Sequence, residues 1–223
     1  MPRTPEDFKM LKKISNFLFS SFFDQYEKEL EKEASGSCES LLDVGCGSNS
    51  PIRRFSKNLI RTTGVDAHGP SIERSRRAGI HKEYFEMNVL DIGNRFPKKS
   101  FDCVLLSDLV EHLPKPEGLK LISMAEKIAR KKVIIFTPNG FLRQGERDEN
   151  PLQVHISGWE VQEMIELGYR VRGINGWKPL RTEEARIAWW PAFFWGKISL
   201  LTQPFVIDHP KDAFQLLCVK KIL

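Results

Sequence analysis

Apolar runs and apolar stripes alternate along most of this 223-residue chain. Short apolar runs bounded by polar or turn residues predict seven strands, over 41–44, 62–66, 83–87, 101–106, 132–137, 169–174 and 213–220. Apolar positions at three- and four-residue spacing predict helices over 51–60, 70–78, 118–129 and 159–167, with Ile52, Phe55 and Ile60 facing inward in the first. Strands separated by helices are typical of βαβ units. The pattern therefore predicts an α/β, Rossmann-like fold with a doubly wound, mostly parallel seven-stranded sheet and helices on both faces.

Two segments depart from this alternation. Residues 5–34 predict an N-terminal helix whose apolar stripe is formed by Phe8, Leu11, Ser15, Leu18 and Phe22. It either packs against the domain or forms a lid over a pocket. Residues 177–210 gather aromatic side chains between breaking prolines and glycines, which indicates an insertion before the last strand. We expect one domain over 1–223, made of a helical cap (1–36), a core (37–176), the aromatic insertion (177–210) and the last strand (211–223).

Composition and charge narrow the class of protein. Hydrophobic residues make up 41% and charged residues 28%, the balance of a soluble globular protein. The net charge of +5 comes without a basic run, so nucleic acid is an unlikely partner. The four cysteines form no C-x-x-C pair, which disfavours a zinc ribbon, a redox motif or a disulfide framework. Without a signal peptide or an apolar run long enough to span a bilayer, the expected location is cytoplasmic.

Polar side chains follow several predicted strands at their carboxyl ends. Asp43 and the loop Gly45-Cys46-Gly47 end the first strand, and Asp66 ends the second, 19 residues after Gly47. Ligands of open parallel sheets bind outside these ends, and a carboxylate about 20 residues after a glycine loop suits a ribose diol. Asp91, after the third strand, suits an adenine amino group. Asp43 favours a cationic sulfonium and disfavours a pyrophosphate, and Ser50 occupies the third glycine position of the dinucleotide fingerprint. These features favour S-adenosylmethionine over NAD.

The ordered set resembles a known family. Leu42–Gly47, Gly64–Asp66, Asn88–Asp91, Phe101–Leu113 and Thr137–Asn139 are similar to successive motifs of class I S-adenosylmethionine-dependent methyltransferases, in the branch that includes ubiquinone-type and many small-molecule enzymes. The resemblance covers roughly residues 40–175. It implies that the cofactor is S-adenosylmethionine, bound by Asp43, Gly45, Cys46, Gly47, Asp66, Ala67, Val89, Leu90, Asp91 and Ser107. In that assignment the glycine loop holds the methionine part, Asp66 the ribose, Asp91 the adenine, and Ser107 lies near the methyl group.

The side of the site that meets the methyl acceptor is less specified. Methyl transfer from a sulfonium is an in-line displacement that needs alignment, and a base only for some acceptors. The candidate residues on the acceptor side are Asp108, Glu111, His112 and His155, of which Asp108, His112 and His155 are the catalytic candidates. His112 could simply orient a helix, and His155 precedes a helix N-cap at Ser157. Two lone histidines do not make a metal site, so none is predicted.

The acceptor itself stays open. The cluster of tryptophan and phenylalanine over 187–206 favours a small or lipid-linked acceptor, with this segment acting either as a peripheral membrane contact or as a cover for the active site. Two alternatives are a methyltransferase acting on RNA or protein and a non-catalytic protein that binds S-adenosylmethionine. The first would need a basic recognition patch or an added domain, and neither is found. The intact Asp43, glycine loop and Asp66 argue against the second.

Overall fold

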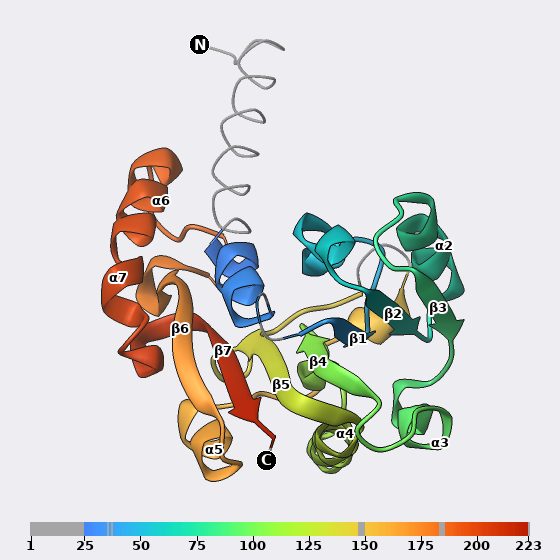
Figure 1. Cartoon of the computed structure of the whole chain (residues 1–223). Helices are drawn as coiled ribbons and strands as arrows, with labels where there is room; N and C mark the ends of the chain where they lie inside the picture. Colours follow the sequence, from blue (N-terminus) through green and yellow to red (C-terminus); the bar gives the residue numbers. More distant parts are fainter. Residues whose placement is uncertain (1–24, 35, 37, 147–149, 183–185, 223) are drawn as a thin grey trace, which may run out of the picture.

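The computed structural model describes residues 25–34, 36, 38–146, 150–182 and 186–222. Its centre is one seven-stranded sheet in the order β3-β2-β1-β4-β5-β7-β6 (Figure 1). The strands are β1 (Ser40–Val44), β2 (Arg61–Asp66), β3 (Glu83–Glu86), β4 (Phe101–Ser107), β5 (Ala129–Pro138), β6 (Arg170–Trp177) and β7 (Ala213–Lys221). Only β7 runs antiparallel to its neighbours, β5 and β6. The predicted doubly wound, mostly parallel sheet is confirmed.

Helices cover both faces of the sheet. The α-helices are α2 (Gly69–Arg77), α3 (Ile92–Arg95), α4 (Lys115–Ile128), α5 (Val161–Glu166), α6 (Ala192–Leu201) and α7 (Gln203–Val206). The short 3-10 helices are η1 (Pro51–Arg54), η2 (Ser56–Asn58), η3 (Val89–Asp91), η4 (Val110–His112), η5 (Pro151–Gln153), η6 (Lys178–Leu180) and η7 (Pro210–Asp212). None of the helices in the described part of the chain combines the length and apolar character that a bilayer span requires.

Alternate residues of the central strand β4 supply two cores. Val104 and Leu106 pack with α3, α4 and α5 on one face of the sheet. Cys103 and Leu105 point to the other face, where they pack with the helical residues 25–34 and with η1 and η2. This follows from the two-residue period of a strand. Because both faces are covered, β4 is buried along its whole length, and its middle forms the continuous apolar run Cys103–Leu106.

The segment 51–60 differs from the prediction. It forms two 3-10 turns, η1 and η2, instead of one helix. Ile52 and Phe55 are buried as predicted, but Ile60 is 69% exposed and Leu59 is buried instead. The chain breaks at Phe55, whose φ of −130° is not helical, and this break shifts the phase of the inward-facing positions. A regular 3.6-residue count therefore selects the wrong residue at the end of the segment.

The helical residues 25–34 pack against the sheet. Tyr26, Leu30 and Ala34 are buried at four-residue spacing, so they form one face of a helix. Glu29 pairs with Arg172 of β6 at 2.8 Å, which ties the helix to the edge of the sheet. These contacts agree with a packed helix. The stripe predicted from Phe8 to Phe22 lies outside the described residues.

The insertion between β6 and β7 forms α6 and α7, which lie along the edge strand β6 (Figure 1). Two glycines of β6 allow a close approach. A Cβ on Gly173 would lie 2.0 Å from the Val206 carbonyl oxygen, and one on Gly176 would lie 2.3 Å from that of Ser199. The large aromatic side chains point away from this contact: Trp189, Trp190, Phe193 and Phe194 are all at least half exposed.

Cys103 and Cys218 are fully buried. The structure also brings the sulfur atoms of Cys38 and Cys103 into bonding contact, with their Cα atoms 6.0 Å apart. That spacing is one that a disulfide spans. Sequence reasoning missed this pair because the two residues are 65 positions apart and form no local motif.

Candidate active site

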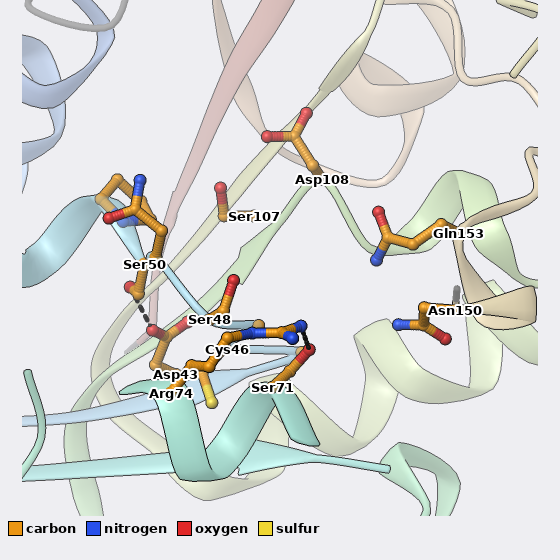
Figure 2. Close-up of a pocket in the computed structure, with 14 residues that line it drawn as sticks. Asp43, Cys46, Ser48, Ser50, Ser71, Arg74, Ser107, Asp108, Asn150 and Gln153 are labelled. Atoms are coloured by element: carbon orange, nitrogen blue, oxygen red, sulfur yellow. Dashed lines mark hydrogen bonds between the residues drawn. The ribbon is translucent and has the colours of Figure 1, made fainter. Parts of the chain in front are cut away.

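A pocket of about 220 Å³ opens at the carboxyl ends of β1 and β4. Figure 2 shows its side chains in two groups, with Asp43, Cys46, Ser48, Ser71 and Arg74 on one side and Asp108, Asn150 and Gln153 across from them. The complete lining is Asp43, Gly45, Cys46, Gly47, Ser48, Asn49, Ser50, Pro51, Ser71, Arg74, Ser107, Asp108, Asn150 and Gln153. The crevice predicted from the order of the strand ends is therefore present, and most of its lining is polar.

The loop after β1 takes backbone angles that favour glycine. Gly45 has a φ of +73° and Gly47 a φ of +56°. The Gly45 and Cys46 amides both donate to the Val65 carbonyl oxygen, at 2.7 and 2.9 Å, so the loop is tied to β2. A Cβ on Gly45 would lie 2.7 Å from Leu109, whereas one on Gly47 would meet nothing within 4 Å. Gly45 thus fits a packed position, and the backbone at Gly47 borders open space.

Asp66 holds this loop from the end of β2. Its two carboxylate oxygens accept hydrogen bonds from the Gly47 and His68 amides, each at 2.8 Å. The side chain is half-buried and does not line the pocket itself. Hydrogen bonds to an ionised carboxylate are stronger than those between neutral groups. Asp66 is therefore part of the machinery that fixes the shape of the glycine loop.

Asp43 lies in a buried hydrogen-bond network. The residue is 1% exposed, and its Oδ2 accepts a hydrogen bond from the Ser50 hydroxyl. The same oxygen lies 2.8 Å from His81 Nε2, and the His81 side chain is fully buried. A buried carboxylate without partners would be costly, and these two contacts offset that cost. Sequence reasoning missed His81, which comes just before β3 and is 38 residues from Asp43. The pairing of β3 with β2 and of β2 with β1 brings the two residues together.

The end of β4 is fixed by a residue from the N-terminal helix. The Tyr26 hydroxyl donates to Ser107 Oγ at 2.8 Å, and its ring stacks on Phe136 with centroids 3.6 Å apart. Burial and the Asp108 carboxylate raise the pKa of Tyr26 well above its ordinary value, so the hydroxyl stays a donor. Asp108 follows with a φ of +45°, a strained angle for a residue other than glycine. Such strain is concentrated at functional sites.

Beside the pocket, the chain brings together Glu111, His112 and His155. Glu111 is 1% exposed, and its Oε2 accepts a hydrogen bond from Thr137 Oγ1 at 3.0 Å. Burial, followed by the negative charge of Asp108, raises the pKa of the Glu111 carboxyl well above its usual range. The two imidazole rings lie edge to face with centroids 4.8 Å apart. The sequence separates these histidines by 43 positions, so it gave no reason to group them.

Comparison with known proteins decides the family. Residues 42–136 match the model of a family described as a methyltransferase domain. A ubiquinone biosynthesis O-methyltransferase from Chromobacterium violaceum is 28% identical over 94 residues, 40% of each chain. Another from a Bradyrhizobium species is 28% identical over 134 residues, 51% of this chain and 52% of the relative. The matches thus span about half of these relatives or less. Over residues 42–136 the chain therefore carries a methyltransferase domain similar to that of the class I S-adenosylmethionine-dependent enzymes.

Solved structures of methyltransferases share the fold across almost the whole chain. A SAM-dependent methyltransferase from Archaeoglobus fulgidus superposes with a TM-score of 0.54 at 18% identity, over 92% of this chain and 99% of that one. Magnesium protoporphyrin IX methyltransferase from Synechocystis PCC 6803 with bound SAM gives 0.55 at 12% identity, over 100% of this chain and 86% of that one. At these identities the likeness establishes the fold alone.

The methyltransferase pocket has the features that S-adenosylmethionine requires. Open space in front of Gly47 allows a ligand to approach the backbone, and the Asp43 carboxylate lies at the wall of the same pocket. The open space would suit a dinucleotide as well, but the Asp43 carboxylate disfavours a pyrophosphate because it would repel it. The residues present therefore fit a ligand whose charge at this point is positive.

The predicted site residues fall into three groups. Asp43, Gly45, Cys46, Gly47, Ser107 and Asp108 line the pocket. Asp66, Ala67, Val89, Leu90 and Asp91 lie at the ends of β2 and β3, outside the lining. His112 and His155 also lie outside it, beside Glu111. Sequence reasoning missed Ser71, Arg74, Asn150 and Gln153, since none belongs to a motif and only the fold brings them to the pocket.

Proposed function

We propose that this chain transfers the methyl group of S-adenosylmethionine to a small or lipid-linked acceptor. The observation that carries the proposal is the position of a buried carboxylate, Asp43, beside a glycine loop at the carboxyl end of β1 in a methyltransferase fold. When bound, S-adenosylmethionine supplies a methyl group on a positively charged sulfur. The acceptor would attack the methyl carbon in line with the carbon–sulfur bond, and the sulfur would leave. The protein has to bind and align the cofactor and the acceptor, and to exclude water.

Each part of the pocket has a task in this proposal. Asp43, held by Ser50 and His81, provides negative charge for the methionine part of the cofactor. Asp66 keeps the glycine loop in place and offers its carboxylate to the ribose hydroxyls. Beyond it, η3 carries Val89, Leu90 and Asp91 at the end of β3, where adenine would lie. The cofactor would thus extend from the pocket across the ends of β1, β2 and β3.

The acceptor side is the opposite wall, formed by Asp108, Asn150 and Gln153 (Figure 2). His112 follows Asp108 by four residues in the sequence, and His155 follows Gln153 by two. Each is a candidate to take a proton from an acceptor hydroxyl, since a neutral imidazole is the usual general base near neutral pH. His155 Nδ1 lies 2.6 Å from the Leu142 carbonyl oxygen, which holds a proton on Nδ1 and places the basic lone pair on Nε2.

The surface of the insertion supports an acceptor that resides in a membrane. Trp190 is 86% exposed, and Phe193 and Phe194 at the start of α6 are 53% and 50% exposed. The exposed Lys197 follows on the same helix. Aromatic side chains with nearby cations are typical of a helix that lies in the bilayer interface. None of the described residues of the insertion lines the pocket, which favours a peripheral membrane contact over a cover.

The cofactor is tested by calorimetry with S-adenosylmethionine, S-adenosylhomocysteine and NAD. We expect the first two to bind and NAD to give no heat. Transfer is then measured with radiolabelled S-adenosylmethionine and three acceptors: a hydroxylated aromatic carrying a polyprenyl tail, the same head group without the tail, and total RNA with protein. Labelling of the RNA or protein alone would contradict the proposed acceptor class, and NAD binding alone would contradict the cofactor.

The membrane contact has its own test, co-sedimentation with vesicles of phosphatidylcholine and phosphatidylglycerol. The double variant Trp190→Ala/Phe193→Ala should lose most of its vesicle binding. A matched control is Leu119→Ala/Ile165→Ala, which removes two exposed apolar side chains (42% and 49%) from α4 and α5. Equal binding by both variants and the parent chain would show that the insertion makes no membrane contact.

A further inference from the structure

The group formed by Glu111, His112 and His155 has the composition and compactness of a metal site. Each residue offers one ligand atom, and these atoms all lie within 4.8 Å of one another. Two imidazoles with one carboxylate form a known ligand set for divalent cations such as Zn²⁺ and Fe²⁺. Glu111 and His155 are buried and His112 is half-buried, so the group lies at the wall of the protein interior and not on an open acidic surface.

Hydrogen bonds fix the orientation of both histidines. His112 Nδ1 lies 3.1 Å from the Val154 carbonyl oxygen, and His155 Nδ1 lies 2.6 Å from that of Leu142. A carbonyl oxygen only accepts, so Nδ1 of each ring carries the proton and Nε2 of the neutral ring carries the lone pair. Metal-binding histidines are oriented in this way, with the second ring nitrogen donating to a carbonyl or carboxylate.

The backbone holds the two halves of the group together. The Ile156 and Ser157 amides both donate to the Glu111 carbonyl oxygen, at 2.8 and 3.0 Å. The Ser157 hydroxyl donates to the Val110 carbonyl oxygen at 3.3 Å. These contacts attach the loop that carries His155 directly to η4, which carries Glu111 and His112. The geometry is therefore set by the fold and does not depend on one flexible side chain.

The Glu111 carboxylate is buried, and its contacts do not fully offset the cost of burying it. Its Oε1 is buried and has no hydrogen-bond partner among the residues that the structure describes. A buried carboxylate oxygen without a partner is unfavourable unless a cation compensates it. A divalent cation would satisfy Oε1.

We propose that Glu111, His112 and His155 bind one divalent transition-metal cation of the Zn²⁺ or Fe²⁺ type. Three protein ligands leave coordination positions for water or an acceptor oxygen, as in catalytic metal sites. Residues close in sequence to these ligands, Asp108 and Gln153, line the pocket, so the cation would lie at its acceptor side. With the cation bound, His112 and His155 act as ligands through Nε2 and not as bases. That the cation holds and acidifies an acceptor hydroxyl rests in addition on the proposed function.

The test uses the full chain after removal of metals with a chelator. Co²⁺ serves as the probe, since its visible absorption reports coordination by imidazole nitrogen, and Zn²⁺ is then added as a competitor. We expect one equivalent of Co²⁺ to bind, with the spectrum lost on addition of Zn²⁺. Glu111→Gln and His155→Ala should each weaken Co²⁺ binding at least ~10-fold, as loss of a ligand does.

His209→Ala is the matched control, because His209 is an exposed histidine that is not part of this group. It should leave the Co²⁺ spectrum and affinity unchanged. Circular dichroism and S-adenosylhomocysteine binding show whether each variant is folded, and Glu111→Gln keeps the volume of the side chain. Absence of Co²⁺ binding by the folded parent chain, or binding that survives in both ligand variants, would overturn the metal site. Because Co²⁺ binding needs no acceptor, this outcome is separate from failure of methyl transfer.

Discussion

Replacing Asp66 by alanine probes the link between the glycine loop and the cofactor. In the structure the two carboxylate oxygens accept from the Gly47 and His68 amides at 2.8 Å. Alanine removes both contacts, and it also removes the oxygens that we expect to accept from the ribose hydroxyls. The loop then loses its attachment at the position where the backbone borders the pocket.

The size of the effect follows from the kind of hydrogen bond that is lost. A hydrogen bond to a charged group contributes about 1.5–3 kcal/mol. Asp66 is only half-buried, so water replaces part of what the amides lose, and we expect the loss of cofactor binding to stay within ~1.5–3 kcal/mol in total. That corresponds to a Kd raised ~10- to 150-fold. Asp66→Asn keeps one acceptor oxygen without the charge, so its Kd should lie between those of the parent chain and of Asp66→Ala.

Calorimetry with S-adenosylhomocysteine measures the change in Kd directly. Glu83→Ala provides the control, because Glu83 at the amino end of β3 also accepts hydrogen bonds, from Thr63 at 2.9 Å and from Arg61. It lies at the opposite edge of the sheet and should leave the Kd unchanged. An unaltered Kd in Asp66→Ala would refute both the loop attachment and the ribose assignment, whereas equal losses in both variants would indicate a general loss of stability.

Three further changes test other parts of the site. Between its ordinary pKa and its raised pKa in the folded protein, Glu111 binds more protons in the native than in the unfolded chain. The free energy of unfolding of the metal-free protein should therefore fall as the pH rises through that range. In a series of urea unfolding curves at different pH, Glu111→Gln should reduce this pH dependence. His81→Gln should lower the free energy of unfolding by ~1–3 kcal/mol and weaken cofactor binding, because it disturbs a buried partner of Asp43; an unchanged denaturation midpoint would contradict that network. Gly45→Ala should destabilise by ~1–3 kcal/mol, since a Cβ there collides and φ is +73°, whereas Gly145→Ala, in open space, should be neutral.

Sequence alone predicts the sheet well because its central strands are buried on both faces. β4 contains the apolar run Cys103–Leu106 and β5 the apolar run Val133–Phe136, and the helix α4 between them has a clear inward stripe. The glycine loop and Asp66 were also predictable, since both follow strands whose carboxyl ends must meet at one edge. Prediction was weaker where local geometry departs from regular helices, as in η1 and η2, where the break at Phe55 shifts the inward positions.

The residues that sequence reasoning missed share a cause: they reach the site only through tertiary contacts. Tyr26 meets Ser107 across 81 positions, and His81 meets Asp43 across 38. Each looks in the sequence like an ordinary member of its own segment. The same holds for His112 and His155, which appear isolated until the loop hydrogen bonds place one ring against the other. Which residues pair in this way is set by the fold and cannot be predicted from the periodicity of the sequence.

The distribution of acids explains which ligands this edge of the sheet can accept. The chain has a net charge of +5, yet Asp43, Asp66, Asp108 and Glu111 follow the carboxyl ends of three neighbouring strands. Two of them, Asp43 and Glu111, are almost completely buried, where charge interactions are screened least. The glycine loop alone sets a shape that a dinucleotide could also use. The carboxylates set the sign of the charge, which favours a sulfonium beside Asp43 and a divalent cation beside Glu111, and disfavours a pyrophosphate at either position.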